Sequence, residues 1–380
     1  MNFDLTKEQT MIKDMVKEFA EEVIKPRAIE IDKEEKFPED IFKEMGKLGF
    51  MGIPFPEEYG GSGGDTVSYA LAVEQIARVC GSTALSYAAN VSLGASPLYY
   101  FGTEEQKQKY LKPIVTGQTL GAFGLTEPNA GSDAGGTRTT AVKDGSEYII
   151  NGEKRFITNA SFSDTITVTA VTGKTEEGRS IISSIIVPTD TKGVTITSNY
   201  DKMGVRGSDT AEVVLEDVRV PVENVLGDEK GGFQQFLETL DGGRISIAAI
   251  GLGIAQASLE RSLQYAKERT QFGKPISKFQ AIQFKLADMA MEVELARNIV
   301  YKAAWLKDNN RPFSKEAAFA KLYATETAFK SANEAIQIHG GYGYMREYEV
   351  ERFLRDAKLL VIGEGTSEVQ RLVIARQLGC

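Results

Sequence analysis

The chain has 380 residues, with 44 Lys and Arg against 53 Asp and Glu, so its formal net charge is −9. That length exceeds what one hydrophobic core usually supports and predicts two or three packed units. An acidic balance argues against a nucleic-acid binder, which needs clustered Lys and Arg to displace counterions. Two cysteines and a single histidine, His339, exclude a zinc finger, a histidine-rich metal centre and a disulfide framework, so we expect no metal site.

Targeting signals are also missing from the sequence. Residues 1–8 carry no basic and apolar signal segment, and no window reaches about 18 consecutive apolar residues, so we expect no membrane span. A bacterial chain of this kind is expected in the cytoplasm. A mitochondrial matrix protein whose transit peptide has been removed would look the same.

Residues 1–120 are predicted to form an N-terminal helical domain. Thr6 is placed to cap the first helix, and glycines near residues 60–64 and 102 separate several helices. Apolar residues recur at steps of three and four, which is the period of one helix face: Ile12, Val16, Phe19 and Val23.

Residues 121–231 are predicted to form a middle β domain. No helical segments separate its strands, which favours an antiparallel sheet or barrel over a parallel βαβ sheet. Asn151-Gly152 predicts a two-residue hairpin turn. The β-rich runs are Tyr148–Ile150, Thr165–Thr169, Ile181–Val187, Val194–Thr197 and Ala211–Leu215.

Residues 232–380 return to a helical period and are predicted to form a C-terminal helix bundle. Gly340-Gly341 is expected to end one of its helices. The seam between helices follows steps of four and three: Ile282, Leu286, Met289, Val293, Ala296 and Val300.

Two glycine-rich segments could approach a bound group closely. Residues 121–136 stand at the entrance to the β domain, and Asn129 to Ser132 could turn N–H groups and a hydroxyl toward a phosphate, or form only a surface turn. The segment is not a Walker A loop, and no dinucleotide fingerprint follows a strand. In the second segment, after residue 338, His339 is expected to be a packed helix-end residue.

Three charged segments are ambiguous when each is taken alone. Glu364 lies between two glycines, where a carboxyl against apolar surface could act as a general base, although residues 366–368 could simply cap the last helix. Asp241-Gly242-Gly243-Arg244 opens a helix and could hold a nucleotide or form a charge pair. Residues 269–274 place Arg269 in a turn between two long helices.

Taken together and in this order, these motifs resemble the acyl-CoA dehydrogenase family of flavoproteins, in particular its short-chain, butyryl-CoA dehydrogenase-like members. The resemblance runs the whole chain and implies that family's fold: an N-terminal helical domain, a middle antiparallel β domain and a C-terminal four-helix bundle. Its most specific pieces are Thr126-Glu127-Pro128 with Gly131-Ser132-Asp133, Arg269 with Phe272-Gly273, Gln337 to Gly341, and Arg355 to Lys358 leading into Glu364.

The resemblance implies FAD, held between domains and across a subunit contact, and an acyl-CoA substrate. The flavin loop and the second flavin strand would supply Phe123, Leu125, Thr126, Gly131, Ser132, Phe156, Ile157 and Thr158. Segments that reach the FAD of a neighbouring subunit would supply Arg269, Gln280, Gln337, Gly340 and Gly341, and the remaining flavin contacts are Thr366 and Glu368. Acyl-CoA would be bordered by Ser132, Gly365 and, at its nucleotide end, Asp241 and Arg244.

The family mechanism gives Glu364 the part of the base. Glu364 would remove the α-proton of the thioester while hydride leaves the β-carbon for flavin N5, giving a trans-2-enoyl-CoA. The Glu364 backbone N–H and a flavin ribityl hydroxyl would stabilise the carbonyl oxygen. The resemblance also implies a homotetramer in fatty acid β-oxidation, with an electron-transferring flavoprotein as electron acceptor.

Two departures from the family pattern bear on the substrate. Many straight-chain members have Tyr where this chain has Gly363, and branched-chain relatives place their base at the position of Gly243. Because Gly243 cannot act as a base and Glu364 is present, the sequence favours the straight-chain arrangement, with short- to medium-chain acyl-CoA thioesters as substrates. Gly363 could widen or reshape the acyl pocket, and among these substrates we expect short-chain ones such as butyryl-CoA.

Three alternatives remain open at the level of sequence. The chain could be a branched-chain, isovaleryl-type dehydrogenase, or an oxidase-like member that passes electrons to oxygen. It could also be a non-catalytic acyl-CoA-binding protein on the same scaffold. The presence of Glu364 argues against this last alternative, because a protein that only binds needs no base there.

Overall fold

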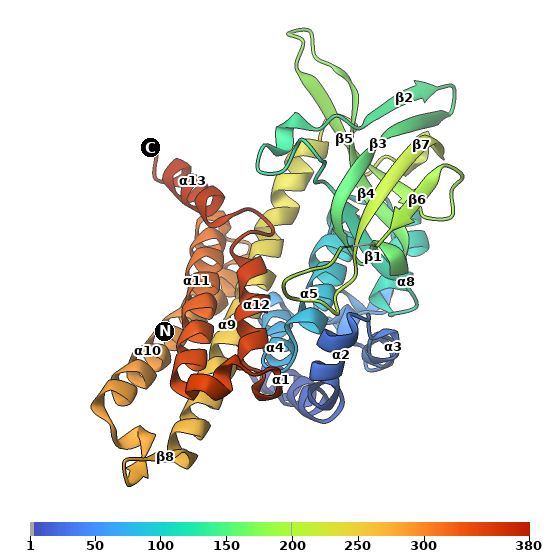
Figure 1. Cartoon of the computed structure of the whole chain (residues 1–380). Helices are drawn as coiled ribbons and strands as arrows, with labels where there is room; N and C mark the ends of the chain where they lie inside the picture. The colour runs from blue at the N-terminus through green and yellow to red at the C-terminus, as the bar shows by residue number, and fades with distance from the viewer. Residues whose placement is uncertain (1–3, 199) are drawn as a thin grey trace.

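The computed structural model of the chain describes residues 4–198 and 200–380. Helices come first, a β-sheet follows, and a second set of helices completes the chain, so the predicted order is confirmed (Figure 1). The expected absence of a signal segment falls partly on residues 1–3, which lie outside the described residues.

The N-terminal helices begin with the predicted cap. Thr6 accepts a hydrogen bond from the Gln9 backbone, and the Gln9 side chain accepts one from the Thr6 backbone, which together form a capping box. Val16 and Phe19 are buried on the inner face of the first helix. The α-helices of this part are α1 (Lys7–Phe19), α2 (Ala28–Glu34), α3 (Glu39–Lys47), α4 (Thr66–Ala77), α5 (Gly81–Ala89), α6 (Ser96–Phe101), α7 (Glu104–Gln106) and α8 (Lys112–Val115).

The described residues of the middle part form a seven-stranded, curled sheet with the strand order β1-β4-β2-β3-β7-β6, and β5 pairs with β4. Most pairs are antiparallel, as expected, but β1 pairs with β4 in parallel and β2 touches β4 in parallel. The strands are β1 (Leu120–Gly124), β2 (Thr140–Asp144), β3 (Glu147–Thr158), β4 (Ser163–Lys174), β5 (Ser180–Pro188), β6 (Val194–Thr197) and β7 (Thr210–Pro221).

The predicted hairpin at Asn151-Gly152 is wrong. Strand β3 runs straight through both residues, and its two halves pair with the same neighbour, β7, across a register shift. The Asn151 side chain exchanges hydrogen bonds with Asp217 of β7, so it holds a β-bulge rather than a turn. The actual turn lies between Asp144 and Glu147, where Gly145 takes a positive φ of 63°.

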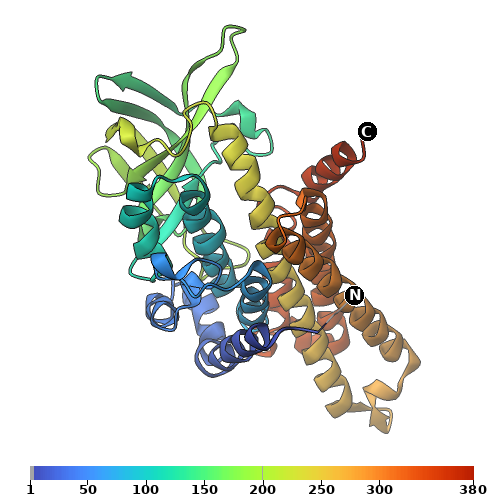
Figure 2. The ribbon, with the colours of Figure 1, turned by 180° about the vertical axis from the view of Figure 1, so that it is seen from behind.

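The C-terminal part is built on one long helix, α9 (Gly232–Glu268), which runs from beside the sheet to the small β8–β9 hairpin at the far end of the bundle (Figures 1 and 2). Met289, Val293, Ala296 and Val300 of the predicted seam are buried, while Ile282 and Leu286 are half-buried. The other elements are β8 (Thr270–Gln271), β9 (Lys274–Pro275), α10 (Gln280–Asp308), α11 (Ser314–His339), α12 (Val350–Leu360) and α13 (Ser367–Gln377).

Helix α9 packs closely against a helix on each of two sides. A Cβ on Gly251 would lie 2.9 Å from the carbonyl oxygen of Ala324 in α11, and a Cβ on Gly253 would collide with the backbone of Glu74 in α4. The N-terminal and C-terminal helices consequently share one continuous hydrophobic core, while the sheet has a core of its own. Most of the buried residues of α11 are small, among them Ala317, Ala320, Ala324, Ala328, Ala332 and Ala335.

The changes of secondary structure fall close to the predicted domain boundaries. Strand β1 begins at Leu120 and helix α9 begins at Gly232, beside the boundaries expected at 120/121 and 231/232. Those boundaries stay a prediction, since the shared core joins the first and last parts.

Among the described residues, α9 is the one helix whose length and hydropathy would suit a membrane span. Of its most apolar stretch, 83% is buried inside the fold. The apolar character of α9 is thus used in packing against its neighbouring helices.

A buried ion pair ties the loop after β1 to the sheet. Lys154 of β3 has a fully buried side chain, and its Nζ lies 2.7 Å from Oε1 of Glu127. Glu127 also accepts hydrogen bonds from the backbone N–H groups of Arg138 and Thr139, at the other end of the loop. Although burial pushes its pKa upward, these partners hold the pKa of Glu127 below its ordinary value. Glu127 therefore joins the two ends of the glycine-rich loop.

Breaking this pair should destabilise the protein strongly. Lys154→Met leaves the Glu127 carboxylate buried without its cation and should cost about 3–5 kcal/mol of unfolding free energy. The double variant Glu127→Gln/Lys154→Met removes both charges and should cost less than the sum of the two single variants. Urea denaturation of the four proteins measures this coupling. Single variants within about 1 kcal/mol of the original would contradict it.

Candidate active site

Glu364 lies in the turn between α12 and α13, at the edge of the helix bundle. Its backbone takes a positive φ of 50°, and Gly365 follows with a φ of 89°. Its carboxylate oxygen Oε2 is buried and has no hydrogen-bond partner among the described residues, although the residue as a whole keeps some exposure. The Glu364 backbone N–H is likewise without a described partner. This carboxyl is therefore available to a ligand.

Burial changes the acidity of this carboxyl. Loss of hydration raises the pKa of Glu364 from 4.5 to about 7, and the positive charges of Lys321 and Arg244 oppose the rise. A carboxyl with this pKa is half ionised near neutral pH, so it can both accept and release a proton there. An upward shift of the Glu364 pKa is also the direction expected from the sequence.

Gly243 of α9 provides the space that the Glu364 carboxylate occupies. A Cβ added to Gly243 would overlap Oε2 of Glu364, so any side chain at this position would displace the carboxylate. The other near neighbour of that Cβ is a methyl group of Leu93. Glu364 is thus held between α9 and the helix turn that precedes α6.

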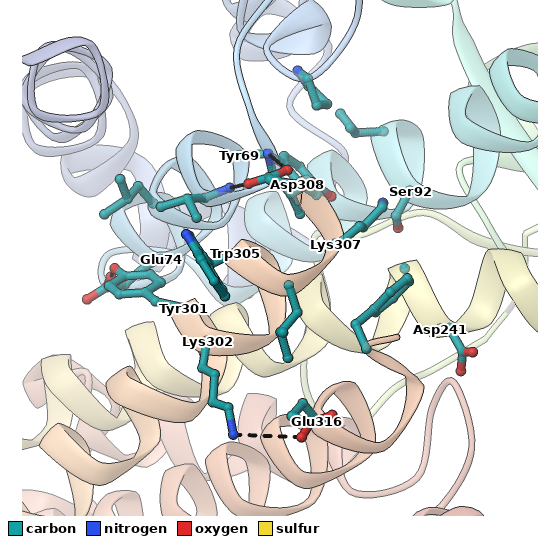
Figure 3. Close-up of a pocket in the computed structure, with 18 of the residues that line it drawn as sticks. Tyr69, Glu74, Ser92, Asp241, Tyr301, Lys302, Trp305, Lys307, Asp308 and Glu316 are labelled. Atoms are coloured by element: carbon teal, nitrogen blue, oxygen red, sulfur yellow. Dashed lines mark hydrogen bonds and ion pairs between the residues drawn. The ribbon is translucent and has the colours of Figure 1, made fainter. Parts of the chain in front are cut away.

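A large cleft of about 2630 Å³ opens between α4, α9, α10 and α11. Figure 3 shows side chains from these helices around it, among them Tyr69 of α4, Asp241 of α9 and Trp305 of α10. Glu364 is not part of its wall, but Asp241 and Gly242 are, and they directly precede the glycine against which Glu364 packs. The cleft therefore reaches the residues of α9 that directly precede Gly243.

The prediction that Asp241 to Arg244 open a helix is wrong. These residues lie inside α9, which begins at Gly232, because the helical segment extends further toward the N-terminus than the glycine pair suggests. Arg244 is only 4% exposed and forms an ion pair with Asp241. Its predicted contact with the nucleotide end of a substrate stays a prediction.

The structure brings together the two strand segments predicted to hold a flavin. The Arg155 backbone N–H donates to the Thr126 carbonyl oxygen at 2.8 Å, which joins the loop after β1 to β3. Phe156 follows with a positive φ of 59° and a side chain that is 61% exposed, whereas Ile157 is buried. Open space surrounds Gly131, and Ser132 is exposed. Phe123, Leu125 and Thr158 are half-buried beside this exposed ring.

At the C-terminal end of the turn, the predicted flavin contacts have local roles as well. The Thr366 hydroxyl accepts a hydrogen bond from the Val369 backbone N–H and so caps α13. The expectation that residues 366–368 could cap the last helix is confirmed for Thr366. Glu368 is exposed in the first turn of that helix. Gly365 has its carbonyl oxygen fixed by Lys321 and Gln370.

A separate group of predicted cofactor residues lies at the far end of the bundle. Arg269, Gly340 and Gly341 line a cleft of about 430 Å³. Gln280 and Gln337 are exposed and do not line it. The remaining wall is formed by Tyr265, Gln271, Ile276, Ile338, His339, Tyr342 and Met345.

His339 is the packed helix-end residue that the sequence predicts. It is 5% exposed, its Nδ1 lies 2.7 Å from the Ala335 carbonyl oxygen, and its ring stacks on Tyr265. Among the described residues, no group of three or more His, Cys, Asp and Glu is arranged to hold a metal ion.

Three family models match the chain in the order of its structural parts. They are the N-terminal domain of acyl-CoA dehydrogenase over residues 6–118, the middle domain over residues 122–218 and the C-terminal domain over residues 230–379. The chain belongs to the acyl-CoA dehydrogenase family. The resemblance read from the sequence is confirmed, and the fold class with it.

Similar proteins of this family cover the whole chain. A probable acyl-CoA dehydrogenase, YngJ, of Bacillus subtilis is 71% identical, and a short-chain specific acyl-CoA dehydrogenase of Clostridium acetobutylicum is 50% identical, each over 100% of both chains.

Solved structures of similar proteins superpose on nearly the whole chain. Butyryl-CoA dehydrogenase from Megasphaera elsdenii superposes with a TM-score of 0.98 at 47% identity, covering 100% of both chains. A 50% identical chain in a structure described as "Electron transferring flavoprotein of Acidaminococcus fermentans: Towards a mechanism of flavin-based electron bifurcation" gives a TM-score of 0.97, covering 100% of this chain and 99% of that one. An acyl-CoA dehydrogenase complexed with FAD from Bacillus anthracis gives 0.93 at 36% identity, covering 99% of this chain and 67% of that one.

The motifs alone do not identify the polar side chains that hold the two parts of the predicted site. Glu127 and Lys154 hold the loop after β1, and Lys321 holds the Glu364 turn. A signal existed for both lysines. Lys154 stands on the inward-facing alternation of β3 with Tyr148 and Ile150, and Lys321 interrupts the buried alanine face of α11.

Replacing Glu364 with Gln should stabilise the fold as pH rises. Because the folded pKa of about 7 exceeds the ordinary 4.5, the stability contributed by the neutral carboxyl is present below pH 4.5 and is lost by about pH 7. Gln stays neutral, so the advantage of Glu364→Gln should grow by up to about 3 kcal/mol between pH 4.5 and pH 8. Denaturation of flavin-saturated proteins at both pH values measures it. A constant difference would contradict the shift.

Proposed function

We propose that this protein is an FAD-dependent dehydrogenase that converts short-chain acyl-CoA thioesters into trans-2-enoyl-CoA, with Glu364 as the base. The observation that carries the proposal is the buried Oε2 of Glu364, which has no partner among the described residues and a pKa near neutrality. Buried polar atoms normally have partners, so an unpaired carboxylate oxygen beside a cleft is a candidate for a reacting group.

Glu364 has two tasks in the proposed reaction, one for its carboxyl and one for its backbone N–H. Glu364 Oε2 accepts the α-proton of the thioester, and the backbone N–H of Glu364 is free to donate to the thioester carbonyl oxygen. Gly243 leaves the space for the carboxylate on the other side. FAD, when held by the middle part of the chain, would supply the redox chemistry as the acceptor of the hydride lost from the β-carbon.

FAD is the cofactor, and the residues of the middle part fit it. The Phe156 ring is 61% exposed and Thr126 and Thr158 are half-buried, and an aromatic ring together with hydroxyl groups suits a flat ring system with polar edges. The exposed backbone at Gly131 and the Ser132 hydroxyl, where nothing crowds the loop, suit a phosphate group. These residues would hold the cofactor through ring contact, hydroxyl groups and backbone N–H groups.

Gly243 also bears on the competing functions. A branched-chain dehydrogenase of the kind considered from the sequence needs a carboxylate at this position, where this chain has a glycine, and an added Cβ would overlap Oε2 of Glu364 in its present place. A non-catalytic binder would have no use for a carboxyl that is desolvated and unpaired, because burying it costs stability. Straight-chain substrates are favoured, and butyryl-CoA is the proposed preference because the similar proteins include short-chain and butyryl-CoA enzymes.

The two groups of predicted cofactor residues imply more than one subunit per site. Gly243, beside Glu364, and Arg269 are separated by 26 residues of α9, which amounts to about 40 Å at 1.5 Å per residue. That distance exceeds the length of one dinucleotide. Arg269 and Gly340 would therefore serve the FAD of a neighbouring subunit, and we propose a homotetramer.

Exposed apolar side chains on the hairpin and along α10 support this assembly. Phe272 at the hairpin tip is 93% exposed, and Phe284, Met291 and Leu295 on α10 are each more than half exposed. Apolar side chains gathered in this way are typical of a surface that another chain covers.

The similar proteins also suggest an electron acceptor and a location for this protein. A flavoprotein that accepts electrons is the proposed partner, since a chain 50% identical to this one occurs in a structure described by an electron-transferring flavoprotein. The bacterial cytoplasm is the proposed location, since the 71% identical protein is from Bacillus subtilis. Nucleic acid is not a proposed partner, given the net charge of −9.

Butyryl-CoA added without oxygen should bleach the flavin absorption band of the purified protein. Glu364→Gln should keep the band and react at least about 10²–10⁴ times more slowly, the usual contribution of a positioned base. Stopped-flow absorption measures both rates. Near-normal reduction of the variant would exclude Glu364 as the base. An unchanged band in the original protein with butyryl-, octanoyl- and isovaleryl-CoA would exclude the function.

Mixing two inactive variants should restore activity if each site is shared. Glu364→Gln disables the carboxyl end, and Arg269→Glu disables the far end. In a pair that contains one subunit of each, one of the two sites has both original parts, so about half of the activity should return. Co-expression with two different tags isolates such pairs. A mixed pair without activity, or an FAD-bound monomer in sizing chromatography, would contradict the shared site.

A further inference from the structure

A lysine is buried in the bundle directly behind the glutamate turn. Lys321 of α11 has no exposed surface, and its Nζ donates to the Gly365 carbonyl oxygen at 2.7 Å. It forms no ion pair with any described carboxylate. Burying an ammonium group without a partner carboxylate is costly, so its retention in this position needs an explanation.

The packing of α11 determines the position of the Lys321 amine. Ala317 and Ala324 lie one turn before and one turn after Lys321 and are fully buried. Gly251 allows α9 to approach the backbone at Ala324. The lysine side chain, enclosed on this small-residue face, has its amine directed to the turn that carries Glu364.

Two donors hold the turn from the same side. Besides Lys321, the Gln370 side chain donates to the Gly365 carbonyl oxygen at 2.9 Å and to the Glu364 carbonyl oxygen at 3.3 Å. Glu364 needs such support because its positive φ is unfavourable for a residue with a side chain. The two hydrogen bonds to one carbonyl oxygen keep the turn in this conformation.

Titratable groups face Glu364 from three helices, and two of them are cations. Arg244 of α9 and Lys321 of α11 both favour its ionised form, and Tyr69 of α4 lies within the field of its carboxylate. Arg244 forms an ion pair with the Asp241 carboxylate, whereas Lys321 forms an ion pair with no described carboxylate. Glu326 and Glu368 act on Lys321 from further away. Lys321 is therefore the cation whose charge is least compensated near Glu364.

The lysine stays charged in the range where Glu364 ionises. Burial lowers the pKa of Lys321 to about 8, and the Glu364 carboxylate opposes the fall. The pKa of Glu364 is about 7, so the carboxylate forms while most Lys321 side chains are still protonated.

We propose that Lys321 is a positioning residue of the reaction: it fixes the Glu364 turn through the Gly365 carbonyl oxygen, and its charge favours the ionised form of Glu364. The inference rests on the proposed role of Glu364 as the base. Lys321 transfers no proton and does not touch the substrate in this account. It acts only through Glu364.

Lys321→Met, which has similar volume and no charge, tests the inference in the FAD-bound protein. Difference infrared spectroscopy follows the Glu364 carboxyl band as a function of pH, with Glu364→Gln assigning the band. Without the cation, the midpoint should rise by about one pH unit or more. The acid limb of the kcat profile with butyryl-CoA should move upward equally, so turnover falls about fivefold at pH 7 and recovers at higher pH.

Gln370→Met is the matched control. It removes the other hydrogen bond to the Gly365 carbonyl oxygen and leaves the lysine charge in place, so it should lower kcat without moving the infrared midpoint. Lys321→Gln, which lacks the charge and keeps an N–H donor, should move the midpoint as Lys321→Met does. It serves as the second variant if Lys321→Met does not retain FAD.

The outcomes separate the two proposals. If Lys321 only ties the bundle together, its variants lower the thermal midpoint and leave the Glu364 midpoint unchanged, and the inference is overturned. If the Glu364 midpoint moves but Glu364→Gln reduces flavin normally, the charge effect stands and the role of Glu364 as base fails. An upward shift in the Lys321 variants alone, with slow reduction in Glu364→Gln, supports both.

Discussion

The close packing of α9 against α4 and α11 is the contact on which the rest of the site depends. Gly251 and Gly253 let the backbones of these helices approach within a few ångströms, and the N-terminal and C-terminal helices thereby share one core. Gly243, two turns earlier on the same helix, admits the Glu364 carboxyl. Burial of the Glu364 carboxyl against this helix raises its pKa, so the same helix contributes to the shared core and to the acidity of Glu364.

Much of the fold could be predicted because its signals are local. The steps of three and four along α1 and α10 and the β-rich runs of the middle part each identify an element without reference to the rest of the chain. The hairpin at Asn151-Gly152 failed because the turn propensity of two residues was weaker than the pairing of both halves of β3 with β7. The parallel pairing of β1 with β4 depends on tertiary placement and left no local trace.

The candidate site could be predicted only in part, because it too depends on tertiary placement. Glu364 stands out because it lies between glycines and because the surrounding motif resembles a known family. The supports of the predicted site come from elsewhere in the chain: Lys321 holds the Glu364 turn from 43 residues earlier, and the ion pair of Glu127 with Lys154 holds the loop after β1. A buried lysine on an alanine-rich helix face marks such a support, but its partner is known only once the helices are packed.

The missing side chain at Gly243 has a consequence for the acidity of Glu364 as well as for its place. A Cβ at Gly243 would meet Oε2 of Glu364, the far end of a flexible side chain, so the carboxyl would have to move away from α9. A carboxyl that moves toward water regains hydration, and the desolvation that raises the pKa of Glu364 would weaken. A single glycine on the long helix is therefore expected to tune a proton-accepting group that lies more than a hundred residues further along the chain.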